Sequence, residues 1–163
     1  MARNWIEDGL QHARERAEQL RLGAERRARQ ASVIRQQGPE VMRAVVAEVR
    51  AVIDEYKRAA QAAASDVEFE ELPHEGFCVT RTTNPRVELQ CRPSYETQAV
   101  YCNMTRSNNP PGEPVERVFS LEFTVNESER VVLREGTRVF QTAGDTVEFL
   151  VKPVLFPPLE DQL

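Results

Sequence analysis

The apolar pattern of this chain changes its period once, near residue 65, and that change limits the folds that the chain can adopt. Before it, apolar side chains recur at steps of three and four residues, which is the spacing of one helix face. After it, apolar and polar side chains alternate, which is typical of strands with one buried face. We therefore predict an α+β protein in which an N-terminal helical segment precedes a sheet.

Two helices are expected in the helical segment, over residues 3–36 and 39–64. Residues 3–36 contain no proline and are rich in strong helix formers. The pair Gly38-Pro39 favours a break, because glycine suits the end of a helix and proline suits the first turn of the next. Pro39 is compatible either with a sharp turn between two helices or with a kink in one helix, and both alternatives stay open.

The second expected helix carries one apolar stripe, with its charged residues largely elsewhere around the helix. The stripe consists of Met42, Val45, Val46, Val49, Val52, Ile53 and Tyr56. A helix with one apolar side must lie on another apolar surface, and the strands follow it immediately. We therefore expect residues 39–64 to lie across one face of the sheet and to fill its core.

Alternation between residues 66 and 143 predicts about five to seven strands. Turn sequences such as Thr83-Asn84-Pro85 separate the alternating runs. Strands this close in sequence pair as hairpins, so an antiparallel meander is expected. The core face should comprise Phe77, Val79, Val87, Leu89, Phe119, Leu121, Phe123, Val131, Leu133 and Val139. The other face should present polar residues, Arg138 among them.

The last segment, residues 144–163, fits either a buried strand or a short helix. Asp145 and Glu148 have the spacing of a helix capping box. Pro153 argues against a central strand, because proline cannot donate a ladder hydrogen bond. A short helix that begins about Asp145 is the favoured interpretation.

A helical arm, residues 1–37, is expected to precede one α+β domain, residues 38–163. Small and apolar residues recur along this arm at steps of four, three, four, three and four residues. This heptad repeat, hereafter the seam, consists of Ile6, Leu10, Ala13, Ala17, Leu20 and Ala24. Such a repeat is typical of helices that pack side by side. The seam should pack against the chain's own second helix or against a second copy, which would give a homodimer.

Charge is distributed unevenly along the chain. Residues 1–65 contain 12 Lys/Arg and 9 Asp/Glu, a net charge of +3, and residues 66–163 contain 9 and 17, a net charge of −8. An acidic domain repels phosphate backbones, and glutamates interrupt the arginines of the arm, so no nucleic acid is expected as a partner. The arm is also too poor in bulky apolar residues for a membrane surface.

No apolar run reaches the roughly 18 residues that span a bilayer. Residues 1–9 lack the apolar stretch of a secretion signal, so a cytoplasmic protein is expected. The three cysteines should then be reduced thiols that act as small apolar residues of the strands.

Residues suited to catalysis or to metal binding are few. His74, Cys78, Cys91 and Cys102 come from neighbouring strands, but they lack the paired ligand spacing that zinc prefers. No glycine-rich phosphate-binding motif occurs, and no Cys–His pair has an evident orienting group. We therefore expect no cofactor, no metal and no enzymatic activity.

These patterns favour a non-enzymatic, cytosolic protein-interaction or scaffold protein that self-associates through its N-terminal helices. Alternatively, the arginines of the arm could bind a different protein that is acidic. Arg81, Arg92 and Arg106, near strand ends, are candidate contacts for an anion or a partner. The alternative function is a small-ligand-binding module with a pocket between helix 39–64 and the sheet.

Overall fold

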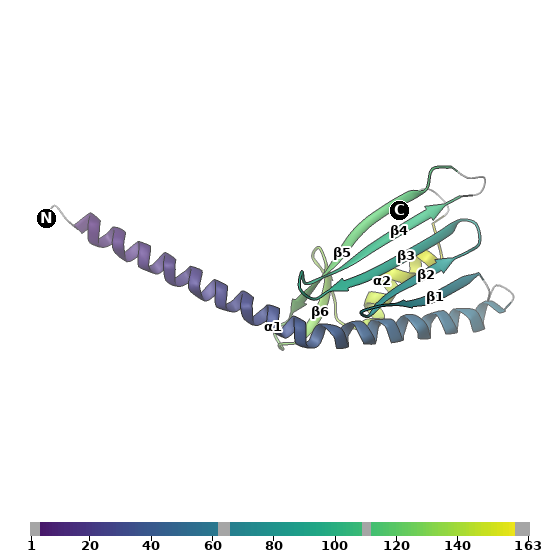
Figure 1. The fold of residues 1–163 in the computed structure, drawn as a ribbon, viewed down its shortest axis with the longest axis horizontal. Coiled ribbons are helices and arrows are strands. Elements are labelled where there is room, and N and C mark those ends of the chain that lie inside the picture. The colour runs from purple at the N-terminus through teal and green to yellow at the C-terminus, as the bar shows by residue number, and fades with distance from the viewer. Residues whose placement is uncertain (1–3, 62–65, 109–111, 159–163) are drawn as a thin grey trace.

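The computed structural model describes residues 4–61, 66–108 and 112–158 of the 163-residue chain. These residues form a long helix, a sheet of seven strands and a short C-terminal helix. The short helix and the C-terminal half of the long helix cover one face of the sheet, and the N-terminal half of the long helix extends away from it (Figure 1). The predicted α+β class is confirmed.

A single helix, α1 (Asn4–Ala60), takes the place of the two helices expected from the sequence. Pro39 lies inside it, so the expectation of two helices is wrong and the kinked-helix alternative is correct. Proline removes one backbone hydrogen bond and bends a helix. Here Ile34 and Met42, on either side of the proline, are both buried in the hydrophobic core and keep the two parts in one helix. Figure 1 shows α1 changing direction where it reaches the sheet.

Gly38 allows close packing instead of ending a helix. A Cβ atom on this residue would lie only 2.7 Å from ring carbon Cδ1 of Tyr95. That ring also packs on Phe123, with 5.6 Å between the ring centroids, and its hydroxyl donates a hydrogen bond to the Glu75 carboxylate at 2.9 Å. Burial, followed by the hydrogen bond to Glu75, raises the pKa of the Tyr95 phenol well above its usual value. Only glycine leaves room for this ring against the helix.

Gln37 ties α1 to the turn that follows the fifth strand. Its side-chain amide donates a hydrogen bond to the carbonyl of Glu129 at 3.3 Å and accepts one from the backbone N–H of Val131 at 3.1 Å. Ile34, one turn earlier, is the first buried residue of the helix and is 2% exposed. We call the described residues from Ile34 onward the body.

The sheet is an antiparallel meander in which each strand pairs with its neighbours in sequence, so the spatial order runs from β1 to β7. Its strands are β1 (Val67–Leu72), β2 (Gly76–Arg81), β3 (Arg86–Ser94), β4 (Ala99–Ser107), β5 (Val115–Val125), β6 (Val131–Glu135) and β7 (Arg138–Phe140). The predicted meander is confirmed, at the upper end of the expected number of strands.

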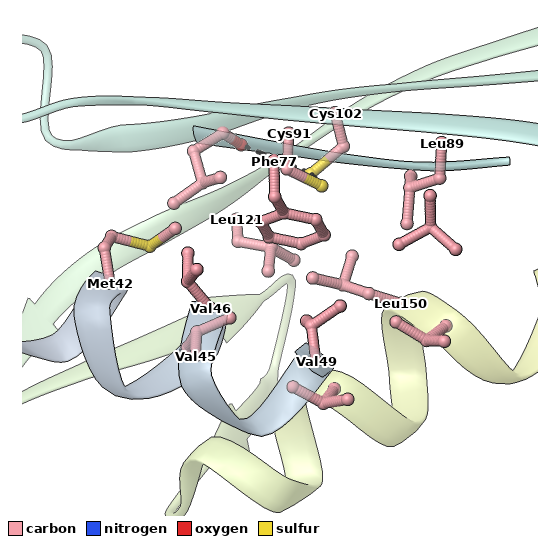
Figure 2. Packing of buried hydrophobic residues seen from close by; sticks show 14 of the residues in the cluster. Met42, Val45, Val46, Val49, Phe77, Leu89, Cys91, Cys102, Leu121 and Leu150 are labelled. Atoms are coloured by element: carbon pink, nitrogen blue, oxygen red, sulfur yellow. Dashed lines mark hydrogen bonds between the residues drawn. The ribbon is translucent and has the colours of Figure 1, made fainter. Parts of the chain in front are cut away.

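The core lies between the inner face of the sheet and the two helices. Val45, Val49 and Ile53 of α1 are each at most 1% exposed. In Figure 2, Val49 of α1 and Leu150 of the C-terminal helix point toward Phe77, which projects from the sheet. Fully burying an aliphatic side chain stabilises a fold by about 1.5–3 kcal/mol. The predicted stripe of residues 39–64 therefore does hold the helix on the sheet.

The C-terminal segment forms helix α2 (Ala143–Leu155), which confirms the favoured interpretation, and residues 159–163 lie outside the described part of the chain. The predicted capping pair, Asp145 with Glu148, is wrong. Thr142 is the N-cap: its hydroxyl accepts a hydrogen bond from the N–H of Asp145 at 3.1 Å, and the Asp145 carboxylate accepts one from the N–H of Thr142 at 3.2 Å. Asp145 thus lies in the first turn, where a carboxylate meets the positive end of the helix.

Strand β7 is one residue out of step with the prediction. Val139 was expected in the core but is 40% exposed, whereas Phe140 is buried. Arg138 therefore does not point outward with the polar face: its guanidinium lies over the rings of Phe140 and Phe149, at 5.2 and 5.4 Å from their centroids. The tight turn at Gly136, which has a positive φ of 58°, resets the alternation between β6 and β7.

Candidate functional site

The N-terminal half of α1 is not covered by any described part of the chain. Every residue from 4 to 30 is exposed except Gly23, which is partly exposed. We call residues 4–30 the exposed segment. Figure 1 shows it as a long helical extension beyond the sheet. Most helical stability in proteins comes from tertiary packing, so an uncovered helix of this length calls for an explanation.

All six residues of the predicted seam lie on the exposed segment, and all six are exposed. The larger ones leave much of their apolar surface in water: Leu20, for example, is 65% exposed. Packing of the seam against the chain's own second helix is ruled out, because that helix is the continuation of the first. The structure thus brings the seam residues together on one helix face and leaves that face open.

A shallow hollow of about 370 Å³ follows the middle of the seam. It is lined by Gly9, His12, Ala13, Arg16, Ala17 and Leu20. Four of these residues, at positions 13, 16, 17 and 20, have the spacing of the four-residue hole that receives a side chain from a neighbouring helix in a coiled coil. Gly9, His12 and Arg16 are not part of the predicted seam. The four-residue steps from Gly9 to Ala13 and Ala17, and from His12 to Arg16 and Leu20, are the signal that could have indicated them.

Ion pairs within the exposed segment support its helical conformation locally. Arg21 donates hydrogen bonds to Glu18 at 2.5 Å and to Glu25 at 2.6 Å, three and four residues away. The hydrogen bond from Arg21 lowers the pKa of the Glu18 carboxyl. Pairs at these spacings favour an isolated helix. They leave the apolar residues of the seam uncovered.

The three arginines predicted as anion or partner contacts do not share one surface. Arg81 donates to the carbonyl of Leu155 at 3.0 Å, and Arg106, which is 5% exposed, donates to the carbonyl of Pro158 at 2.8 Å. Both belong to the inner face of the sheet and bind the end of α2 and the residues after it. Arg92 is exposed on the outer face. Their role in binding an anion or a partner stays a prediction.

All three cysteines are free thiols and buried. Cys91 and Cys102 pair across β3 and β4 on the inner face, with their Sγ atoms 3.3 Å apart, and Cys78 lies on the outer face. Burial raises the pKa of the Cys91 and Cys78 thiols, which makes them poor nucleophiles at neutral pH. His74 is exposed in the turn between β1 and β2. Within the described ranges, no three His, Cys, Asp or Glu residues cluster as a metal site would require.

The hollows of the body lie at its margins. One of about 160 Å³ opens where α1 meets β6 and β7, beside Val45 and Phe140. An apolar one of about 260 Å³ lies between α1 and α2, beside Val52 and Phe156. Pockets for small organic ligands usually measure about 300–1,000 Å³ and enclose most of the ligand. Neither hollow reaches that size. A third, of about 330 Å³, lies between α1 and the hairpin of β1 and β2, beside Val46, Arg50 and Glu75; it reaches the lower end of that range and is open to solvent.

Comparison of the chain with protein-family models, with curated proteins and with solved structures found no match. Neither helix in the described part of the chain combines the length and the apolar character needed to cross a membrane. The open seam of the exposed segment is therefore the candidate binding surface of this chain.

Proposed function

We propose that this chain is a non-enzymatic, cytoplasmic protein-interaction or scaffold protein that forms a homodimer through its exposed segment. One observation carries the proposal: a regular heptad seam lies on 27 consecutive helical residues that the rest of the described chain leaves uncovered. The cytoplasmic part of the proposal is supported by three cysteines that are all free thiols.

Covering the seam would supply a useful but limited free energy. Ile6, Leu10 and Leu20 are its large apolar side chains, and all three are exposed. Burying one such side chain contributes about 1.5–3 kcal/mol, so the six from two copies would contribute roughly 9–18 kcal/mol. Association itself costs about 4–15 kcal/mol. We therefore expect a dimer of modest affinity whose population depends on protein concentration.

A second copy is the partner that fits the alanines of the seam. At Ala13 and Ala17 a neighbouring helix must approach closely to make contact, because the methyl group extends so little from the backbone. That approach is possible only if the facing residues of the neighbour are also small. The exposed segment meets this condition itself, since it presents the same two alanines at the centre of its own seam.

Light scattering behind a size-exclusion column, over a range of protein concentrations, tests the proposal. The full chain should approach the mass of a dimer as concentration rises. Leu20→Glu places a charge in the seam and should give a monomer at every concentration. Leu22→Glu is the matched control, because Leu22 is also exposed but points away from the seam at about 100° per residue. A monomer throughout, or equal effects of both variants, would contradict the proposal.

The small-ligand alternative depends on the hollow of about 330 Å³ between α1 and the hairpin of β1 and β2, beside Val46 and Glu75. It is the weaker candidate, because that volume lies at the lower end of the range for ligand pockets and half of the lining residues, Arg43, Arg50, Glu71 and Glu75, are charged. A ligand bound there would raise the melting temperature as its concentration increases, since it would bind the folded state only. Such a shift, measured with small organic compounds, would favour this alternative.

A further inference from the structure

We propose that the two copies pair antiparallel, so that residue i of one exposed segment faces residue 30 − i of the other and the twofold axis crosses the pair at the level of residue 15, between Ala13 and Ala17. This inference rests on the self-association proposed above and adds its orientation and register. It follows from the spacing of the seam, from the position of the body and from the charges beside the seam.

The seam is complementary to its own reverse. Its six positions fall into three pairs whose numbers add to 30: Ile6 with Ala24, Leu10 with Leu20, and Ala13 with Ala17. An antiparallel second copy in this register therefore sets every seam residue opposite another seam residue. The hollow over positions 13, 16, 17 and 20 then receives Ala13 of the second copy, as a hole receives a side chain in a coiled coil.

The two ends of the seam also face each other in this register. The next heptad position after Leu20 and Ala24 is residue 27, and Arg27 is unsuited to an apolar layer. Helix α1 begins at Asn4, which in this register faces residue 26 of the second copy. The overlap thus runs from about residue 4 to about residue 26 in both copies, and it is complete before the body begins at Ile34.

The body is compatible with this orientation and obstructs the other. The seam and the buried stripe of α1 point to the same side of the helix, within about 50° of each other at 3.6 residues per turn. The buried stripe consists of Ile34, Gly38, Met42, Val45, Val46, Val49 and Ile53. In a parallel pair, the second helix would continue along that side into the space that the sheet occupies (Figure 1). In an antiparallel pair, it ends before reaching the sheet.

Charges beside the seam favour the same orientation. Glu7 and Arg21 each follow a seam residue, Ile6 and Leu20, so both lie on the same flank of the seam. Antiparallel helices bring this flank of one copy against the same flank of the other, so that each Glu7 meets Arg21 of the other copy. Arg14 on this flank and Arg16 on the opposite flank each face their own counterpart near the twofold axis, and the two Glu7–Arg21 contacts offset these repulsions. Parallel helices would instead set Arg21 against Arg16 of the second copy, a like-charge pair that is destabilising.

A charge exchange tests the register. Glu7→Arg should weaken dimerisation about threefold to tenfold, because it replaces two attractive contacts by two repulsive ones. Adding Arg21→Glu to the same chain should restore the affinity. Dimerisation constants from sedimentation equilibrium measure both effects. Unchanged affinity in Glu7→Arg, or tighter dimerisation by Arg21→Glu alone, would overturn the antiparallel register.

Distances between spin labels test the orientation directly in the full chain. Glu15→Cys and Arg29→Cys occupy equivalent heptad positions on the outer side of the helix. At 1.5 Å per residue, the two labels of an antiparallel pair are separated along the helix axis by about 0 Å at position 15 and about 42 Å at position 29. The unsubstituted chain, treated with the same spin label, is the control for labelling of the three native thiols, which are buried.

The possible results separate the two proposals. A short distance at position 15 with a long one at position 29 supports the antiparallel pair. Short distances at both positions overturn the orientation while leaving the self-association intact. Absence of dipolar coupling at both positions, together with a monomeric mass by light scattering, overturns the self-association and the orientation together.

Discussion

The two halves of α1 belong to one helix but differ in what their side chains can contact. Residues 34–60 present Val45, Val49 and Ile53, which interdigitate with the side chains of the sheet. Residues 4–30 present alanine and leucine within a charged surface, and none of these residues is buried. Branched aliphatic side chains fill the space between a helix and a sheet, whereas alanines require the closer approach of another helix. The difference teaches that side-chain size along one helix selects between two kinds of packing partner.

Truncating one apolar residue in each half should give the largest contrast. Ile53→Ala leaves a cavity in the core and should lower the free energy of unfolding by about 2–5 kcal/mol. Leu20→Ala, measured at concentrations where the chain is monomeric, should change it by no more than about 0.5 kcal/mol, because the side chain is exposed. Urea denaturation followed by far-UV circular dichroism measures both. Similar costs at the two positions would remove the distinction between the halves.

Two glycines of α1 sharpen the comparison further. A Cβ atom at Gly38 meets the Tyr95 ring at 2.7 Å, so Gly38→Ala should destabilise the body by about 1–3 kcal/mol through overpacking. A Cβ atom at Gly9 meets nothing within 4 Å, so Gly9→Ala should increase the helix content of the exposed segment, because alanine favours a helix over glycine by about 1 kcal/mol. Thermal melts and circular dichroism measure the two effects, and opposite signs are expected.

Removing the cap of α2 should affect the body alone. Thr142→Ala deletes the hydroxyl that accepts from Asp145 and should cost about 1 kcal/mol of stability. The dimerisation constant should not change, because α2 does not contact the exposed segment in the described structure. Thr142→Ser, which retains the hydroxyl, is the control. A loss of dimer in Thr142→Ala would mean that the two halves of α1 are coupled through the body.

The smallest expected effect is a dependence of body stability on alkaline pH. Burial raises the pKa of Tyr95 in the folded state, so the fold favours the neutral phenol. This contribution is complete below the unfolded pKa of about 10 and is lost as pH rises above it. Unfolding free energies measured from about pH 9 to about pH 11 should fall less steeply in Tyr95→Phe than in the original chain. An equal pH dependence of the unfolding free energy in both chains would show that the phenol of Tyr95 is as accessible to solvent in the folded state as in the unfolded state.

Most of the sheet could be predicted because alternation is a local pattern that each strand carries by itself. The errors fall where a distant contact decides the outcome. In the sequence, Gly38 and Pro39 have the pattern of a helix end. In the structure, the glycine instead makes room for the ring of Tyr95, which is distant in sequence. In β7, a turn residue that belongs to neither strand sets which of Val139 and Phe140 is buried.

The candidate site was predictable in part. Periodicity alone located the seam, because a heptad repeat is a property of consecutive residues. It did not exclude the chain's own second helix as the partner, since that depended on the continuity of α1 through Pro39. The contacts of Arg81 and Arg106 with the C-terminal segment also lie beyond sequence reasoning, because they join residues 74 and 52 positions apart.

Amide hydrogen exchange along α1, measured at several protein concentrations, tests most directly the claim that one half of the helix is held by the body and the other by a second copy. We expect the protection of residues 34–60 to be independent of concentration. We expect the protection of residues 4–30 to be weak in dilute solution and to rise as the concentration passes the dimerisation constant. Protection of residues 4–30 that stays the same across the whole range would contradict the claim.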